Sequence, residues 1–510
     1  MFRRRIAATA AFAATAALVL TGCSGGEPAT DSEDGARGER LTLISISSPT
    51  SFDIGAGAEW GTRSAYFEAV YDTLLRQNAQ GEIEPALATE WEYNDDNTVL
   101  TLTLRDDATF TDGAPVDAAA VVASLERLRD GTSQVAGTMI GQEYAAVDDT
   151  TVTVTLPAPN PALLTQLAIA GGLIASPDSF DDPDVATSPV GSGPYILDTD
   201  ATVTGTTYVF EANPDYWDQD AIKYDALTIN VMQEATAILN AILAGEADGA
   251  PIDNNTLAEV EGAGWSYEST ELDFQGMMIL DRDGEMAPQF ADPKVRQAIN
   301  MAFDREALLE AMQDGHGTVT EQVFQPGWDA FDESLDSTFE YDPEGAKALL
   351  AEAGYPDGFA VTMPSIATFQ TTLDLVAQQL ADIGIDVTYE DPGTGQFLTS
   401  ILTPKYPMTW MSLAQSPDWN TATILLAPNA VFNPFKTQRD EVDAYIDQMQ
   451  NGTEDEAAGA AHGLNQYIVD EGWFAPFFRV QGSFGVSEDT TFEYWPTNMF
   501  PSLFSFEPKN

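Results

Sequence analysis

Few side chains in this sequence are suited to chemistry. The 510 residues include two histidines, His316 and His462, and one cysteine, Cys23. The histidines are far apart in sequence and neither has a second ligand at zinc-site spacing, so we expect no bound metal and no cofactor. A single cysteine cannot form a disulfide within the chain. Cys23 is therefore the only soft nucleophile available.

The sequence motifs of common enzymes are absent. There is no His-Glu-x-x-His zinc motif and no Gly-Lys-Ser/Thr phosphate loop, and no Gly-x-Ser-x-Gly elbow occurs after residue 40. Gly191-Ser192-Gly193 precedes Tyr195–Leu197, which has the pattern of a strand, so no helix dipole faces an anion there and a tight turn is expected. With 81 acidic residues, some carboxylates must lie close together by chance. A secreted carboxylate-based hydrolase remains a remote alternative, and we expect no enzyme.

The amino terminus has the pattern of a secretion signal. Arg3, Arg4 and Arg5 precede an apolar run from Ile6 to Leu20, which is shorter than the roughly 20 residues of a membrane-spanning helix. Leu20-Thr21-Gly22-Cys23 resembles the lipobox of bacterial lipoproteins. This resemblance implies that residues 1–22 are removed and that Cys23 carries a lipid on the extracellular face of the cell membrane. The alternative is an incidental cysteine at the end of an ordinary signal.

The charge of the chain is strongly negative. It has 81 acidic against 21 basic residues and a formal net charge of -60. Because nucleic-acid binding depends on clustered Lys and Arg, such a partner is excluded. An acidic solvated surface suits an exported protein, and weak steering of cationic ligands is the alternative. Residues 23–40 are rich in Gly, Ser, Asp and Glu, which predicts a flexible tether.

The remaining sequence predicts an α/β protein with additional antiparallel strands. Val99–Leu104 and Val152–Leu156 alternate apolar residues with threonine, as half-buried strands do. Helices are expected after three residues that can act as N-caps, Asp117, Asp292 and Asp342. We expect Gly131 to end the first of these helices in the left-handed conformation.

Several segments, in this order, resemble the family 5 solute-binding proteins of ABC importers, which include dipeptide, oligopeptide and nickel receptors. The segments that carry the resemblance are Tyr71–Leu75, Glu84–Ala88, Leu104–Val116, Pro189–Tyr195, Asn213–Trp217, Asp292–Leu308 and Ala351–Pro356. The resemblance implies a two-lobed fold like that of periplasmic binding proteins (type II, cluster C), with an extra domain on lobe one.

The resemblance also implies residue boundaries for the two lobes and the extra domain. Lobe I is expected to comprise 41–75, 190–285 and 485–510, the extra domain II 76–189, and lobe III 286–484. The implied partners are a small-molecule or peptide ligand and the permease and ATPase subunits of an ABC importer, with the chain itself a monomer. A sensory or other surface binding protein of the same fold is the alternative function.

Candidate ligand-binding residues follow from the same resemblance. In peptide-binding members an Asp beside an aromatic residue binds the ligand's ammonium group, and Asp418-Trp419-Asn420 is similar to that segment. Asp418 could instead cap a turn after Pro417. The other candidates match segments that line the pocket in relatives, although their aromatic members could equally be core residues. They are Trp410, Trp60, Gly61, Phe274, Gln275 and Met277.

The expected ligand is a peptide or another amine-bearing compound. Some peptide-binding relatives place an Arg shortly before the Asp to bind a ligand carboxylate, but residues 406–417 contain no Arg or Lys. A free peptide carboxylate is therefore less securely predicted. The scarcity of histidine argues against direct capture of nickel, whereas a chelated metal needs fewer protein ligands.

Overall fold

The computed structural model describes residues 37–414, 416–495 and 500–509. Cys23, the expected signal and residues 23–36 of the expected tether lie outside this range. From Gly38 onward the chain is already paired, because Gly38 forms a parallel bridge with Tyr224. No helix in the described ranges combines the length and hydropathy needed to span a membrane.

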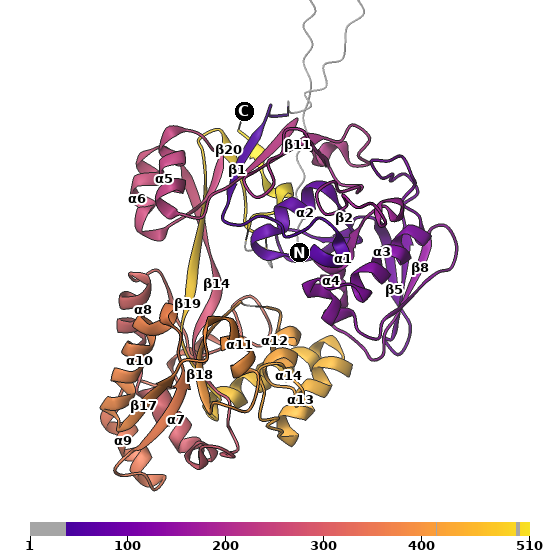
Figure 1. The fold of residues 1–510 in the computed structure, drawn as a ribbon. Coiled ribbons are helices and arrows are strands. Elements are labelled where there is room, and N and C mark those ends of the chain that lie inside the picture. The colour runs from indigo at the N-terminus through magenta and orange to yellow at the C-terminus, as the bar shows by residue number, and fades with distance from the viewer. Residues whose placement is uncertain (1–36, 415, 496–499, 510) are drawn as a thin grey trace, which may run out of the picture. The chain divides into compact units, whose positions relative to one another are not determined.

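The fold is built on a mixed sheet, which has nine strands in the described part of the chain (Figure 1). Eight strands follow the order β10-β11-β12-β1-β13-β19-β14-β18, and β15 pairs with β19. Only the pairs of β1 with β12 and with β13 are parallel within it. The strands are β1 Leu41–Ser45, β10 Tyr195–Leu197, β11 Thr207–Ala212, β12 Ala226–Val231, β13 Gly249–Ile252, β14 Ser266–Ile279, β15 Gly317–Val319, β18 Met408–Ala414 and β19 Phe474–Val486.

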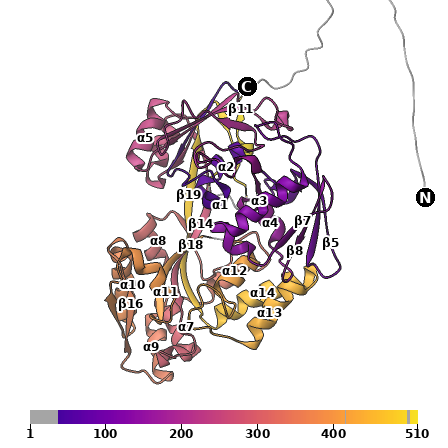
Figure 2. The ribbon, with the colours of Figure 1, turned by 45° about the vertical axis from the view of Figure 1, so that its right-hand side comes forward.

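A separate antiparallel sheet has the order β5-β6-β8-β7, with α3 packed against β7 and β8 (Figure 2). Its strands are β5 Ala88–Tyr93, β6 Val99–Leu104, β7 Glu143–Ala146 and β8 Thr151–Thr155. The two predicted strands are therefore present, the second shifted by one residue. The two-stranded sheets are β2 Asp72–Thr73 with β9 Leu173–Ile174, β3 Leu75–Gln77 with β4 Ile83–Pro85, β16 Phe359–Pro364 with β17 Ile385–Glu390, and β20 Thr490–Thr491 with β21 Glu507–Pro508.

The helices surround these sheets. They are α1 Ile54–Gly57, α2 Ser64–Val70, α3 Ala118–Asp130, α4 Leu163–Leu167, α5 Ala235–Ala244, α6 Leu257–Gly262, α7 Pro293–Met301, α8 Arg305–Gln313, α9 Pro343–Glu352, α10 Gln370–Asp382, α11 Phe397–Ile401, α12 Asp418–Leu425, α13 Asp440–Asn451 and α14 Glu454–Asp470. All three predicted caps are confirmed: Asp117, Asp292 and Asp342 accept hydrogen bonds from backbone N–H groups in the first turns of α3, α7 and α9.

The end of α3 differs from the prediction. Gly131 has φ -82° and ψ -164°, so it is extended and the expected left-handed cap is wrong. Glycine is required there for another reason, because a Cβ would lie 2.0 Å from the carbonyl oxygen of Gly55. That carbonyl accepts hydrogen bonds from the N–H groups of Thr132 and Ser133. Contact with a distant segment, not helix geometry, therefore selects the glycine.

The buried apolar residues form separate clusters. The largest joins residues of the 41–231 region to Phe484, Val486 and the carboxyl-terminal aromatic residues. Two others lie between Phe274 and Phe478. Strands β14 and β19 pair along most of their lengths, from Ser266 with Val486 to Met278 with Phe474, and so run from the first cluster into the others. The expected residue limits of the lobes and of the added domain stay a prediction.

Candidate functional site

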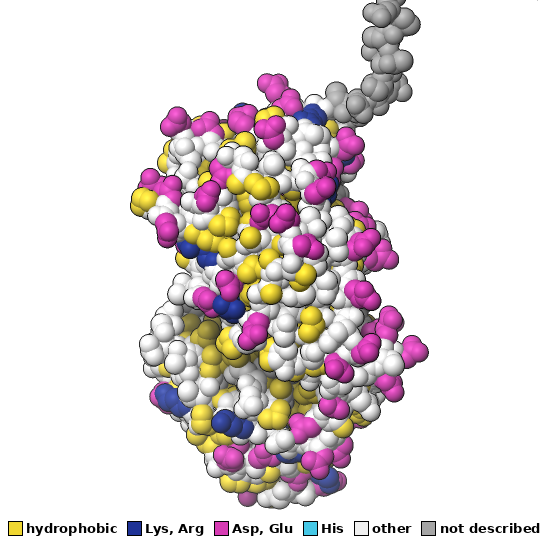
Figure 3. Space-filling view, turned by 90° about the vertical axis from the view of Figure 1, so that its right-hand side faces the viewer, with side chains coloured by type: hydrophobic (Ala, Val, Ile, Leu, Met, Phe, Trp, Pro, Cys, Tyr) yellow, Lys and Arg dark blue, Asp and Glu magenta, His cyan; other side chains and the backbone are white. Residues whose placement is uncertain are grey.

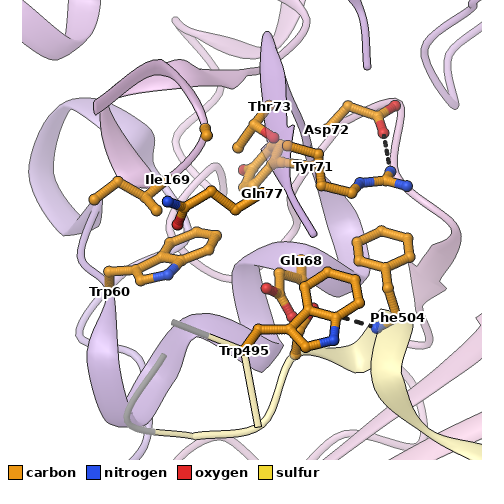
Figure 4. Close-up of a pocket in the computed structure, with 12 residues that line it drawn as sticks. Trp60, Glu68, Tyr71, Asp72, Thr73, Gln77, Ile169, Trp495 and Phe504 are labelled. Atoms are coloured by element: carbon orange, nitrogen blue, oxygen red, sulfur yellow. Dashed lines mark hydrogen bonds and ion pairs between the residues drawn. The ribbon is translucent and has the colours of Figure 1, made fainter. Parts of the chain in front are cut away.

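A hollow of about 440 Å³, which includes space open to solvent, is lined by segments far apart in the sequence (Figure 4). Trp60 comes from the loop after α1, Glu68 and Tyr71 from α2 and its end, and other residues from β2, β3 and the turn after α4. The carboxyl-terminal segment closes another side. The lining residues are Trp60, Glu68, Tyr71, Asp72, Thr73, Arg76, Gln77, Ala168, Ile169, Trp495, Ser502 and Phe504.

Two tryptophans contribute apolar surface to this hollow. Trp60 lies beside Ile169 and Gln77, and Trp495 lies beside Glu68 (Figure 4). Gly61, directly after Trp60, has φ +77°, a left-handed conformation that favours glycine. The carboxylate of Glu68 accepts a hydrogen bond of 2.7 Å from the N–H of Leu503, which ties the carboxyl-terminal segment to α2. Flat aromatic faces next to polar groups suit a small organic ligand.

Asp72 lines the hollow, and both oxygens of its carboxylate accept hydrogen bonds. It is 2% exposed, and it accepts hydrogen bonds from Ser192 Oγ at 3.0 Å, Tyr216 Oη at 2.9 Å and Trp217 Nε1 at 3.1 Å. Arg76 Nη2 lies 3.8 Å from its carboxylate. Burial raises the pKa of Asp72, while Arg76 and the three donors oppose that rise. Asp72 and its three hydrogen-bond donors belong to segments that carry the family resemblance, and in this structure they join those segments to one another.

The loop Val190–Tyr195 also proves to be a packing element. Ser192 supplies one donor to Asp72. A Cβ at Gly191 would lie 1.9 Å from the carbonyl oxygen of Val70, and one at Gly193 would lie 2.6 Å from the backbone nitrogen of Tyr71. The two glycines therefore allow two backbone segments to approach closely, and Tyr195 then opens β10 as the sequence predicted.

Asp418 lies elsewhere, as the first residue of α12, and does not line the hollow. It is 8% exposed. Its Oδ2 accepts a hydrogen bond of 2.8 Å from the N–H of Ala330. Its Oδ1 is also buried, but no described residue provides it with a hydrogen bond. Burial and, to a smaller extent, the nearby carboxylate of Asp329 raise the pKa of Asp418 to about 6, against the opposing effect of the backbone N–H groups of Ala330 and Asp329.

The two residues after Asp418 have less distinctive surroundings. Trp419 is partly buried and packs against the cluster that contains Phe274 and Leu425. Asn420 is half-buried. The carbonyl oxygens of both accept hydrogen bonds from Thr423 Oγ1 within α12. Asp418 contacts Ala330, a residue distant in sequence, so its observed partner is not a local turn after Pro417.

Several predicted site residues lie in the hydrophobic core. Trp410 on β18 is 6% exposed, and its ring centroid lies 4.8 Å from that of Phe369. Phe274 and Met277 on β14 are 3% and 1% exposed. Gln275 is half-buried between β18 and β19. Among the predicted residues only Trp60 lines the hollow, so the ligand-binding roles of the others stay predictions.

Sequence reasoning missed Trp495 and Gln77. Trp495 lies near the end of the chain in no recognisable motif, and only the return of that segment to α2 brings it to the hollow. Gln77 lies two residues beyond the quoted Tyr71–Leu75 segment, so a wider view of that segment would have included it. The histidines are outside this site. His462 Nε2 is 3.8 Å from Asp332 Oδ2 at the surface, and the described residues contain no group of three potential metal ligands.

Comparison with known proteins identifies the family. Residues 82–430 match the model for "Bacterial extracellular solute-binding proteins, family 5 Middle". The glutathione-binding protein GsiB of Salmonella paratyphi A is 32% identical over 345 residues, which is 65% of this chain and 65% of that protein. The match therefore spans slightly less than two thirds of that relative.

Solved structures show the same fold. HbpA2 from Haemophilus parasuis superposes with a TM-score of 0.81 at 22% identity, covering 92% of this chain and 100% of that one. The ABC transporter-associated periplasmic binding protein DppA from Helicobacter pylori, in complex with the peptide STSA, gives 0.75 at 22% identity, covering 93% and 99%. The fold is thus the two-lobed type II fold expected from the sequence.

The chain belongs to family 5 of the bacterial extracellular solute-binding proteins. Members of this family are solute-binding proteins. The acidic character of the chain is visible at its surface, where Asp and Glu side chains far outnumber Lys and Arg on the face shown in Figure 3.

Proposed function

We propose that this protein captures a small peptide or another amine-bearing solute and delivers it to the permease and ATPase of an ABC importer. The observation that carries the choice of ligand is the unused, buried Oδ1 of Asp418. A buried carboxylate is costly unless a cation or hydrogen-bond donors compensate it. A ligand ammonium group supplies both a positive charge and donors.

The hollow between Trp60 and Trp495 supplies the second half of the proposal. It offers aromatic faces to the ligand's apolar part. A ligand that touches both lobes favours the closed state only by its differential affinity, and about 5.5 kcal/mol shifts closure from 1:99 to 99:1. Closure is the signal that we expect the importer to recognise.

The identity of the ligand can be approached directly. Native mass spectrometry of the domain that begins after Cys23, purified gently, reveals any small molecule that accompanies it. Because GsiB is named for glutathione binding, glutathione and simple dipeptides are the first compounds to titrate by calorimetry. The proposal expects saturable binding of an amine-bearing compound, and lower affinity for its N-acetylated form. Equal affinity for both forms would reject the ammonium contact.

Substitution of Asp418 tests the same contact. Asp418→Asn keeps the side-chain shape and an acceptor for Ala330 but removes the charge. We expect affinity for the amine ligand to fall about 10- to 100-fold, since hydrogen bonds to charged groups contribute about 1.5 to 3 kcal/mol. The matched control is Asp329→Asn, a neighbouring but exposed acid, which should change affinity by less than about twofold because exposed charge pairs contribute little.

The pH dependence of ligand affinity is an independent test of the Asp418 contact. Protonation of Asp418, whose pKa is about 6, removes the charge that attracts the ammonium group. Between pH 7 and pH 5 the wild-type affinity should fall about tenfold, as expected for a single group of that pKa. Asp418→Asn should lack this dependence. A wild-type protein whose affinity is constant over the same range would contradict the assignment.

The lipid anchor is part of the same proposal. Leu20-Thr21-Gly22-Cys23 supports attachment of a lipid at Cys23 after removal of residues 1–22. Such an anchor keeps the receptor at the extracellular face of the membrane, close to its importer. Mass spectrometry of the amino-terminal peptide should find a lipid-modified Cys23, and Cys23→Ala should release the protein from the cell. Membrane retention of Cys23→Ala would contradict this proposal.

A further inference from the structure

A fully buried arginine follows β14, far along the chain from the hollow around Trp60. Arg282 is 0% exposed. It lies in a turn held by Asp281, whose carboxylate accepts hydrogen bonds from the N–H groups of Glu285, Met286 and Ala287. The guanidinium carbon of Arg282 is 4.5 Å from the centroid of the Trp473 ring and 5.0 Å from that of Phe474. Aromatic faces thus accommodate the cation but provide no conventional acceptor.

The hydrogen-bond donors of Arg282 and Trp473 have no partner among the described residues. Nε, Nη1 and Nη2 of Arg282 are all buried without an acceptor among the described residues, and so is Nε1 of Trp473, which is 0% exposed. A guanidinium has five N–H donors and the indole has one, and neither group has an acceptor. Buried donors are nearly always satisfied in native proteins. The described chain does not satisfy these, so a partner from outside it is required.

The neighbouring charged groups are already occupied. Asp283 accepts a hydrogen bond of 2.7 Å from Arg439 Nη2. Glu471 Oε2 accepts one of 2.7 Å from Arg296 Nη2, and Arg296 Nη1 donates to the carbonyl oxygen of Phe290. The carboxylates of Asp281, Asp283 and Glu471 are therefore all engaged, the first by backbone N–H groups and the other two by arginines other than Arg282.

The arginine nevertheless remains charged near neutral pH. Burial and, to a smaller extent, the nearby Arg296 and Arg439 lower its pKa to about 9, and Asp283 partly offsets this fall. At pH 7 about 99% of such a group is protonated. A water molecule would satisfy some donors but would leave the charge uncompensated and bring donors of its own. An anion accepts hydrogen bonds only and also compensates the charge.

We propose that Arg282 and Trp473 form a buried binding site for a small monovalent anion of the chloride class. Neither Arg282 nor Trp473 lines the hollow around Trp60. The role of the anion site is structural: the anion compensates the Arg282 charge and joins the turn after β14 to the start of β19. The inference does not depend on the identity of the transported solute.

Crystals of the wild-type protein grown or soaked in bromide test the site without any variant. An anomalous bromide peak in contact with the Arg282 guanidinium would support the proposal. Ordered water at that position, with no anomalous signal at a bromide concentration that labels surface sites, would overturn it. This experiment is independent of transport, because it needs no added solute.

Thermal unfolding tests the same anion site in solution. At constant ionic strength, replacing gluconate with chloride should raise the Tm of the wild-type protein in a saturable manner, as for any ligand that binds only the native state. Arg282→Met keeps an unbranched chain against Trp473 but removes the donors, and it should lose this response. Lys405→Gln removes an exposed cation, paired with Glu390, that is not among the charged groups acting on Arg282, and it should retain the response. A wild-type Tm that is indifferent to chloride would overturn the proposal even if Arg282→Met does not fold.

Discussion

Two buried aspartates in this protein have similar exposure but opposite surroundings. Asp72 receives three side-chain hydrogen bonds and faces Arg76. Asp418 faces only the backbone N–H groups of Ala330 and Asp329, and its Oδ1 has no hydrogen bond of regular geometry among the described residues. Burial raises the pKa of both. The difference shows that burial alone does not identify a binding residue: the hydrogen-bonding capacity left unused distinguishes a structural carboxylate from a candidate site.

The largest expected effect is on the structural side of this comparison. Asp72→Ala would leave Arg76, Tyr216 and Trp217 without their common acceptor. We expect the free energy of unfolding to fall by about 3 to 5 kcal/mol, the usual loss when one partner of a buried ionic network is removed. Urea denaturation followed by tryptophan fluorescence measures it. Ser192→Ala removes one donor only and should cost about 1 kcal/mol.

Equal losses from Asp72→Ala and Ser192→Ala would show that the network around Asp72 contributes no more than a single hydrogen bond. The contrast between the two aspartates would then no longer hold.

The next largest expected effect is the change in stability with pH that arises from Asp418. Because its folded-state pKa is raised from 3.8 to about 6, the native state binds the proton more tightly than the unfolded state does. Without ligand, this group's stabilising contribution is complete below about pH 4 and is lost as pH rises to about 6. The loss amounts to at most roughly 3 kcal/mol, at 1.36 kcal/mol per pKa unit. Urea titrations of wild type and Asp418→Asn at pH 4 and pH 7 measure it.

Wild type should lose stability relative to Asp418→Asn between these pH values. Asp329→Asn should show a somewhat smaller loss than wild type, because it keeps Asp418 but removes a neighbouring charge that raises the pKa of Asp418. A constant difference between wild type and Asp418→Asn would mean that the Asp418 carboxylate is not strained by burial in the unliganded protein.

The smallest expected effect tests whether Trp60 contacts the ligand or only stabilises the fold, as another partly buried tryptophan would. Trp60→Ala should weaken ligand binding about tenfold, since an aromatic stacking contact contributes about 0.5 to 1.5 kcal/mol beyond its buried area. Trp91→Ala is the control: Trp91 is also half-buried but lies on β5, outside the hollow. Calorimetric titration of both variants decides the matter. Equal effects of the two substitutions would indicate that Trp60 acts through stability and not through contact.

Local chemistry made a large part of the fold predictable. Asp117, Asp292 and Asp342 all cap helices as expected, because an Asx side chain satisfies free N–H groups only a few residues away. The alternation of Val99–Leu104 likewise identified β6, since a half-buried strand has a period of two. Gly131 shows the limit of such reasoning. Its spacing suggested a helix cap, but the carbonyl of Gly55, which is distant in sequence, determines its role.

The candidate site was less predictable than the fold. Trp410 was a reasonable ligand contact by resemblance, yet its ring packs on Phe369 in the core. Trp495 had no signal of its own and reaches the hollow through the carboxyl-terminal segment. A tryptophan in a sequence reveals its size and its single donor, but not whether its face meets other residues or a ligand.

The sequence by itself determined the family, the mixed α/β class, the acidic surface and the helix caps, because each depends on composition or on neighbours within a few residues. Only the tertiary structure decided which buried polar groups are satisfied. Asp72 and Asp418, like Arg296 and Arg282, cannot be told apart by type or by local pattern. The partners of Asp72, Asp418 and Arg296 include groups from segments more than 80 residues away, and the donors of Arg282 have no partner among the described residues.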